Sequence, residues 1–202
     1  MRDATEALIV IDVQNDFCPG GALAVTRGDE IIPMINEMLP DFQVKVFTQD
    51  WHPAGHSSFA STHAEKEPYQ TIEMPYGTQV LWPDHCIQGS IGARFHDHLH
   101  RDRADLIIRK GFRAEIDSYS AFFENDQTTP TGLEGYLRTR GVTKLTLVGL
   151  ATDFCVAYSA VDGARLGFEV TVLERACRAI DLDGSLDAAR AEMRAAGVKL
   201  EA

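Results

Sequence analysis

The sequence lacks a basic excess, a long apolar run and a phosphate-binding glycine motif. Nineteen Lys and Arg stand against thirty Asp and Glu, and the formal charge of −11 repels nucleic acid and anionic lipid surfaces. The apolar run at 7–11 ends on an acid and is too short for a membrane span or a signal peptide. Neither GxGxxG nor GKS/GKT occurs, so the usual signals of dinucleotide and nucleoside triphosphate binding are missing. These absences predict a cytoplasmic protein that binds neither nucleic acid nor membranes.

Cysteine is scarce and scattered. The four cysteines are far apart in the chain and form no CxxC pair: Cys18, Cys86, Cys155 and Cys177. Without a secretory signal we expect free thiols rather than disulfides. We interpret Cys18, Cys86 and Cys177 as packing residues, which leaves Cys155 as the candidate for chemistry.

The 202 residues, 45% of them hydrophobic, suffice for one large domain, and strand-like and helix-like segments alternate along them. Apolar runs rich in β-branched residues lie at 7–13, 44–49, 105–110, 143–150 and 168–174. Their apolarity is continuous, which is typical of strands covered on both faces. Helical patterns lie at 29–39, 133–141, 153–167 and 185–197, the last two ending on glycine. This order predicts one α/β domain over residues 1–202, a three-layer α/β/α fold with a mostly parallel, Rossmann-like central sheet.

The stretch from about 50 to 91 interrupts this alternation. It is rich in His, Pro, Ser, Gly and aromatic residues and has little periodicity. A loop of this length in a compact domain is usually functional, although covering a sheet edge is the other interpretation. Its segments DWHPAGHSSF and WPDHC contain Asp50, His52, His56 and His85. Such mixed oxygen and nitrogen donors suit zinc, iron or manganese.

The remaining histidines are weaker candidates. His96, His98 and His100 alternate in FHDHLHRDR, a spacing that on a strand would place three imidazoles on one face. Because the surrounding residues are charged, we predict a solvated segment, with a metal site as the alternative. We interpret His63 as a structural or surface residue.

Reactive side chains follow four of the predicted strands. They are Asp12, Asp50 with His52, Lys110, and Cys155. Since ligands bind outside the carboxyl ends of strands in open α/β sheets, these side chains are expected at one edge. A helix N-terminus and the Lys110 ammonium would favour the Cys155 thiolate, while Asp12 takes and returns a proton. Each residue alone also has a structural explanation, but their convergence predicts an Asp, Lys, Cys triad.

The GLATD segment before Cys155 predicts a tight turn. Gly149 and Ala151 are small, and free backbone amides in a strand-to-helix turn can form an oxyanion hole. An ordinary turn in which Thr152 or Asp153 caps the helix is a compatible interpretation.

Four aromatic residues are candidates for a pocket that holds a flat ring: Phe17, Trp51, Trp82 and Tyr119. Core packing explains any one of them equally well.

With these motifs the sequence resembles the nicotinamidases, within the isochorismatase-like cysteine hydrolase superfamily. The resemblance covers nearly the whole chain and rests on IDVQNDFCPGGAL, TQDWHPAGHSSFAS, WPDHCIQGSIGA, RKGF, DSYSAF and VGLATDFCV. DWHP together with WPDHC points to the nicotinamidase branch. The resemblance implies hydrolysis of nicotinamide to nicotinate and ammonia through a cysteine thioester, in NAD salvage, with pyrazinamide as a further substrate.

The resemblance also implies roles for individual residues. The implied catalytic triad is Asp12, Lys110 and Cys155. The implied oxyanion hole consists of the amides of Ala151 and Cys155, beside a cis peptide bond between Leu150 and Ala151. The implied ligands of one divalent zinc, iron or manganese ion are Asp50, His52 and His85. The implied ring-binding aromatics are Phe17, Trp82 and Tyr119.

Two positions depart from a uniform family pattern. His56 matches a ligand found in only some members, and Phe154 stands where many relatives have Tyr or His.

Two other functions remain open at this stage. One is a different amidase or isochorismatase-like hydrolase. The implied metal ligands argue against this function, because such relatives generally lack them. The other is a non-catalytic α/β module that binds a metal or small molecule. The Asp, Lys, Cys triad argues against this function. The sequence carries no signal of oligomeric state, so a homo-oligomer is neither predicted nor excluded.

Overall fold

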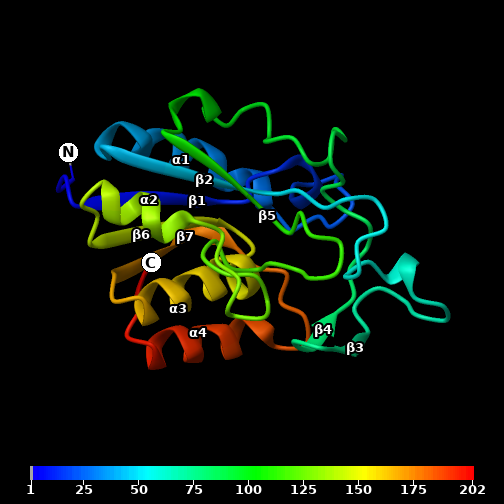
Figure 1. The fold of residues 1–202 in the computed structure, drawn as a ribbon. Helices are drawn as coiled ribbons and strands as arrows, with labels where there is room; N and C mark the ends of the chain where they lie inside the picture. Colours follow the sequence, from blue (N-terminus) through cyan, green and yellow to red (C-terminus); the bar gives the residue numbers. More distant parts are fainter. Residues whose placement is uncertain (1) are drawn as a thin grey trace.

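A six-stranded sheet forms the centre of the molecule in a computed structural model that describes residues 2–202 (Figure 1). The strand order is β5-β2-β1-β6-β7-β8, and every neighbouring pair is parallel. The strands are β1 (Glu6–Ile11), β2 (Val44–Asp50), β5 (Leu106–Lys110), β6 (Lys144–Leu150), β7 (Glu169–Arg178) and β8 (Lys199–Glu201). The predicted parallel α/β sheet is confirmed. Of the six strands of this sheet, only β8 was not predicted, because three residues are too few to show a pattern.

Helices cover both faces of this sheet. They are α1 (Ile32–Met38), α2 (Leu133–Thr139), α3 (Ala157–Arg165) and α4 (Ser185–Ala195). Figure 1 shows α1 on one side of the sheet and α3 and α4 on the other. Gly167 and Gly197 follow α3 and α4 with φ of +86° and +85°, so the predicted glycine caps are confirmed. Across residues 2–202, no helix combines the length and apolarity that crossing a bilayer requires.

The two central strands explain the continuous apolar runs. All of β1 from Ala7 to Ile11 is buried, as is β6 from Leu145 onward, because both faces are covered. Gly149 of β6 has φ of +123°, and a Cβ there would lie 2.1 Å from the carbonyl oxygen of Ile11. Glycine is therefore required where β6 passes β1. Because the sheet includes strands from both ends of the chain, we propose a single domain.

The sheet has a switch point between β1 and β6. From β1 the chain continues to β2 and β5 on one side, and from β6 it continues to β7 and β8 on the other. In open α/β sheets, ligands bind beyond the carboxyl ends of the strands at such a point. This places the expected site at the residues that follow Ile11 and Leu150.

Much of the segment between β2 and β5 lies beyond these carboxyl ends, and its last part runs back to the start of β5 (Figure 1). It contains an antiparallel hairpin of β3 (Thr71–Met74) and β4 (Gly77–Val80), which the sequence analysis did not predict. Two single bridges tie the segment internally, His52 with Ile87 and Phe59 with Trp82. Most of the hairpin is exposed or half-buried, so its strands carry no apolar pattern that periodicity could detect.

Candidate active site

Lys110 lies at the centre of the site. It ends β5, is 0% exposed, and stands in register with Asp50 of the neighbouring strand. Its Nζ lies 2.8 Å from Asp12 Oδ2 and 3.4 Å from Cys155 Sγ, and it donates to Asp50 Oδ1 and, at 2.9 Å, to the carbonyl of Ser118. The structure thus brings the predicted triad residues together, because parallel strands end at one edge of the sheet.

Asp12 presents one oxygen to this cluster. Thr48 Oγ1 donates to Asp12 Oδ1 at 2.6 Å and accepts from the Asp12 amide at 3.1 Å. Within residues 2–202, Oδ2 accepts no aligned hydrogen bond, although the Lys110 ammonium is close by. Burial raises the pKa of Asp12 against the opposing charge of Lys110. Oδ2 is therefore the atom best placed to take a proton.

Cys155 is a buried thiol close to three charged side chains. Burial raises its pKa well above the ordinary value; Lys110 opposes the rise, and Asp12 and Asp50 add to it. The effect of Lys110 on the thiol thus has the predicted direction, but burial and the two carboxylates outweigh it. A carboxylate oxygen of Asp12 lies within 4.8 Å of Cys155 Sγ, so an acceptor for the thiol proton is close by.

The turn before Cys155 has an unusual backbone. The Leu150–Ala151 peptide bond is cis, as the resemblance implied. One turn of π-helix follows, Thr152–Val156, in which the Ala151 carbonyl accepts from the amides of Phe154 at 3.2 Å and Val156 at 3.1 Å. Ala151 and Cys155 both line a pocket beside the thiol. Their place on its wall is compatible with the predicted oxyanion hole.

No side chain caps this helical turn, so the capping interpretation is wrong. Asp153 instead reaches the segment before α4. Its carboxylate accepts hydrogen bonds from the amides of Ile180 at 3.0 Å and Asp181 at 2.7 Å and from the Ser185 hydroxyl at 2.5 Å. This links the turn that carries the thiol to the segment before α4.

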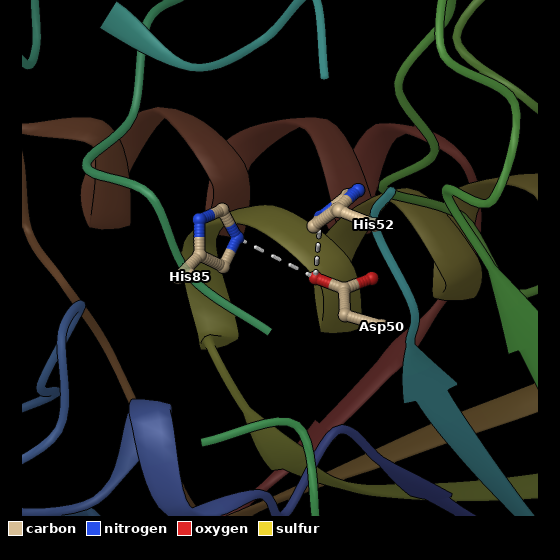
Figure 2. Close-up of side chains that lie close together, drawn as sticks. All are labelled: Asp50, His52 and His85. Atoms are coloured by element: carbon tan, nitrogen blue, oxygen red, sulfur yellow. Dashed lines mark ion pairs between the residues drawn. The ribbon is translucent and has the colours of Figure 1, made fainter. Parts of the chain in front are cut away.

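Asp50 and His52, at the end of β2, converge with His85 from a separate segment (Figure 2). Asp50 Oδ2 lies 3.6 Å from His52 Nε2 and 3.8 Å from His85 Nε2, too far for hydrogen bonds. Each imidazole donates its Nδ1 hydrogen to a carbonyl at 2.8 Å, His52 to Gly111 and His85 to Pro83. Both Nε2 atoms therefore present lone pairs toward the carboxylate.

These three residues fit a divalent cation. Burial opposes the charge of Asp50, but the Lys110 ammonium outweighs it and holds the pKa of Asp50 well below its usual range. One anionic oxygen and two neutral nitrogens, each imidazole oriented by a carbonyl, form a donor set typical of zinc or iron sites.

The other histidines do not join this group. His56 lies next to His52, but its Nε2 is 3.2 Å from the Ile116 carbonyl and its Nδ1 is 2.8 Å from Ser58 Oγ, so both nitrogens are hydrogen-bonded. His98 and His100 are exposed, and over residues 2–202 no metal-like cluster includes any histidine of the HxHxH motif. This agrees with a solvated segment.

The pocket beside Cys155 has aromatic side chains in its wall and is partly open to solvent. Its lining residues are Phe17, Leu23, Asp50, Trp82, His85, Asp117, Tyr119, Ala151, Phe154, Cys155 and Ile180. The predicted aromatics Phe17, Trp82 and Tyr119 are among them. Trp51 is not, so that prediction is wrong: its ring packs 3.9 Å from the Arg109 guanidinium.

Comparison with known proteins identifies the family to which this chain belongs. The family described as Isochorismatase domain matches residues 6–201. The chain belongs to the isochorismatase family. It is 55% identical to a nicotinamidase of Acinetobacter baylyi, over 96% of this chain and 90% of that protein. The solved structure of a nicotinamidase/pyrazinamidase of Acinetobacter baumanii is 54% identical, with a TM-score of 0.98 over 100% of this chain and 97% of that chain. A pyrazinamidase of Pyrococcus horikoshii in complex with zinc is 36% identical, with a TM-score of 0.77 over 97% and 98% of the two chains.

Several site residues of this isochorismatase-family chain were missed. Leu23, Asp117 and Ile180 reach the pocket from irregular segments, where no periodicity indicates which way a side chain points. Thr48 is one of several polar residues near a strand end, and nothing in the sequence pairs it with Asp12. The resemblance singled out Phe154 only as a departure from the family pattern; its ring packs edge-on against Trp82 with a 4.9 Å centroid separation.

Proposed function

We propose that this isochorismatase-family protein hydrolyses nicotinamide to nicotinate and ammonia. The observation that carries the proposal is Cys155, placed between a Lys110–Asp12 ion pair and an aromatic pocket that ends at Asp50 and His85. The activities named for the similar Acinetobacter proteins support it. A flat neutral ring fits between Phe17, Trp82 and Tyr119 without any steering charge, so the surplus of acids plays no part in recognition.

The reaction begins with the thiol. Cys155 passes its proton to Asp12 Oδ2 as its sulfur attacks the amide carbonyl carbon, and backbone amides of Ala151 and Cys155 hold the oxyanion. Asp12 then protonates the departing nitrogen, the C–N bond breaks and ammonia leaves a thioester. Asp12 next removes a proton from water as the water oxygen attacks the thioester carbon. The C–S bond breaks, the sulfur regains its proton, and nicotinate is released.

Lys110 stabilises the negative charge that forms on Cys155 during this reaction. Its ammonium lies between the two carboxylates and beside the sulfur, so it offsets the negative charge that appears on Cys155 during attack. Burial opposes its charge, yet Asp12 and Asp50 hold the pKa of Lys110 well above its ordinary value. Lys110 is therefore cationic throughout the cycle and does not itself transfer a proton.

We propose that Asp50, His52 and His85 hold one divalent ion. When bound, a zinc, iron or manganese ion supplies a Lewis acid for the pyridine nitrogen and for water. The zinc complex of the similar Pyrococcus horikoshii protein supports zinc without deciding between these metals. On the protein side, Asp50 and His85 line the pocket wall, so a ligand placed there is oriented relative to Cys155.

Removal of the metal is expected to weaken substrate binding more than thiol reactivity. A chelator should raise KM for nicotinamide by about tenfold or more, because orientation of the ring is lost. The rate of Cys155 alkylation by iodoacetamide should change by less than about threefold, because the triad contacts remain. Steady-state kinetics and mass spectrometry measure the two effects. Equal loss of both would contradict a template role for the ion.

Gly111→Ala is expected to weaken metal binding by about ten- to a hundredfold. Gly111 has φ of +63°, and a Cβ there would lie 2.4 Å from Cε1 of His52. Its carbonyl also accepts the Nδ1 hydrogen that orients the imidazole. Titration calorimetry of the metal-free protein measures the affinity. Gly135→Ala is the control, since its Cβ meets nothing within 4 Å; unchanged affinity in Gly111→Ala would argue against His52 as a ligand.

We further propose pyrazinamide as a second substrate, a place in NAD salvage and a cytoplasmic location. Pyrazinamide has the same flat ring and carboxamide. The four cysteines are unpaired, as expected in a reducing compartment.

Incubation with nicotinamide and measurement of ammonia tests the central proposal directly: no release by the metal-loaded protein would refute it.

A further inference from the structure

The β3–β4 hairpin points a single fully buried side chain inward. Seven of its eight strand residues are exposed or half-buried, whereas Gln79 is 0% exposed. A buried carboxamide without partners would cost stability, so its contacts indicate what it does. Gln79 itself is not part of the pocket lining.

The nitrogen end of Gln79 contacts the pocket wall. Nε2 lies 2.8 Å from Tyr119 Oη, 3.1 Å from Asp117 Oδ2 and 2.7 Å from the Val80 carbonyl. Tyr119 and Asp117 both line the pocket beside Cys155. Gln79 therefore joins the hairpin to two residues of the substrate wall.

The oxygen end fixes the orientation of the amide. Gln79 Oε1 accepts from Asn125 Nδ2 at 3.1 Å and from the Tyr76 hydroxyl at 3.2 Å. Asn125 in turn accepts the Tyr119 amide hydrogen through Oδ1 at 3.0 Å. Donors at one end and acceptors at the other leave a single orientation for the Gln79 amide.

The same network reaches Trp82. Its Nε1 donates to Tyr119 Oη at 3.1 Å, so the phenolic oxygen receives hydrogen bonds from both Trp82 and Gln79. The rings of Trp82 and Tyr119 meet edge-on with centroids 6.2 Å apart. Movement of the Tyr119 hydroxyl would therefore alter two of the four aromatic side chains that line the pocket, Tyr119 and Trp82.

We propose that Gln79 is a positioning residue that sets the aromatic wall of the substrate pocket. It acts through Tyr119 and Trp82 and touches neither the thiol nor the metal-binding group. The inference rests on the proposed function, since it assigns Gln79 to affinity for the flat ring rather than to the chemical step. It also gives the hairpin a part in recognition of the substrate.

The test replaces Gln79 by methionine, which keeps the length of the side chain and removes all its hydrogen bonds. KM for nicotinamide is expected to rise about tenfold, because Tyr119 loses a buried partner. We expect kcat to change by less than about threefold, because the triad contacts do not include this residue. The matched control is Gln70→Met, the same change at an exposed position just before β3.

A second measurement does not depend on turnover. In a Trp51→Phe background Trp82 is the only tryptophan, and its emission in Gln79→Met should shift to longer wavelength as the ring loosens. Gln79→Glu, which keeps the shape but places an oxygen against Asp117, should give the same shift and serves if the methionine variant does not fold.

Unchanged KM together with unchanged emission would overturn the proposal. A fall in kcat that matches the rise in KM would also overturn it, since that pattern belongs to general loss of structure. Failure of the parent protein to release ammonia would refute the proposed function alone, because the emission of Trp82 still tests the placement of Gln79.

Discussion

Replacing Cys155 by alanine is expected to lower kcat for nicotinamide by at least about 10⁴-fold. The sulfur supplies the attacking electron pair, and no other side chain on the pocket wall is a nucleophile of comparable strength. Ammonia release measures the loss. Acid quenching of the parent enzyme during turnover, followed by mass spectrometry, should show an acyl adduct on Cys155 that the variant lacks.

Cys177→Ala is the matched control. This thiol is also buried, lies outside the pocket, and burial raises its pKa to about 12. The substitution should leave kcat within about twofold and cost about 1 kcal/mol of stability, as small cavities do. Ammonia release that survives in Cys155→Ala would refute the covalent mechanism but would not contradict nicotinamide as the substrate.

The sheet edge could be predicted because few properties determine it. Continuous apolar runs identify strands, and the residue after each run must lie at the carboxyl end. Asp12, Asp50, Lys110 and Cys155 were therefore grouped without any knowledge of distances. Five of the six sheet strands follow from that pattern, which persists because helices cover both faces.

The electrostatics of the site could not be predicted in the same way. The thiol pKa depends on how many carboxylates come close, and that number follows from the register in which Asp50 pairs with Lys110. Gly111 and Gln79 were missed because their roles arise from contacts across irregular segments. Nothing local in the sequence indicates that Gly111 leaves room for His52 or that Gln79 faces inward.

One carboxylate links the two halves of the site. Asp50 Oδ1 contacts the Lys110 ammonium, while Oδ2 faces His52 and His85. Asp50 therefore joins the proposed metal-binding group to the ion-pair network, in which Lys110 is the cation shared by Asp12 and Asp50.

Lys110→Met should therefore have the largest combined effect of any substitution in the site. It leaves two carboxylates buried without a cation, which costs about 3–5 kcal/mol of stability. In a chain of this size that lowers Tm by about 10 °C. kcat should fall by at least about 10³-fold, because charge on the attacking sulfur is no longer offset. Calorimetry and ammonia release measure the two effects, with the exposed Lys199→Met as control.

The stability loss in Lys110→Met should depend on pH in a definite direction. Without the ammonium, the folded-state pKa of Asp12 and of Asp50 should lie above the unfolded value of about 3.9. A raised folded-state pKa disfavours folding only once the pH exceeds the unfolded value. The difference in Tm between parent and variant should therefore be largest near pH 7 and shrink toward pH 4. A constant difference across that range would mean that lost packing, rather than uncompensated charge, causes the destabilisation.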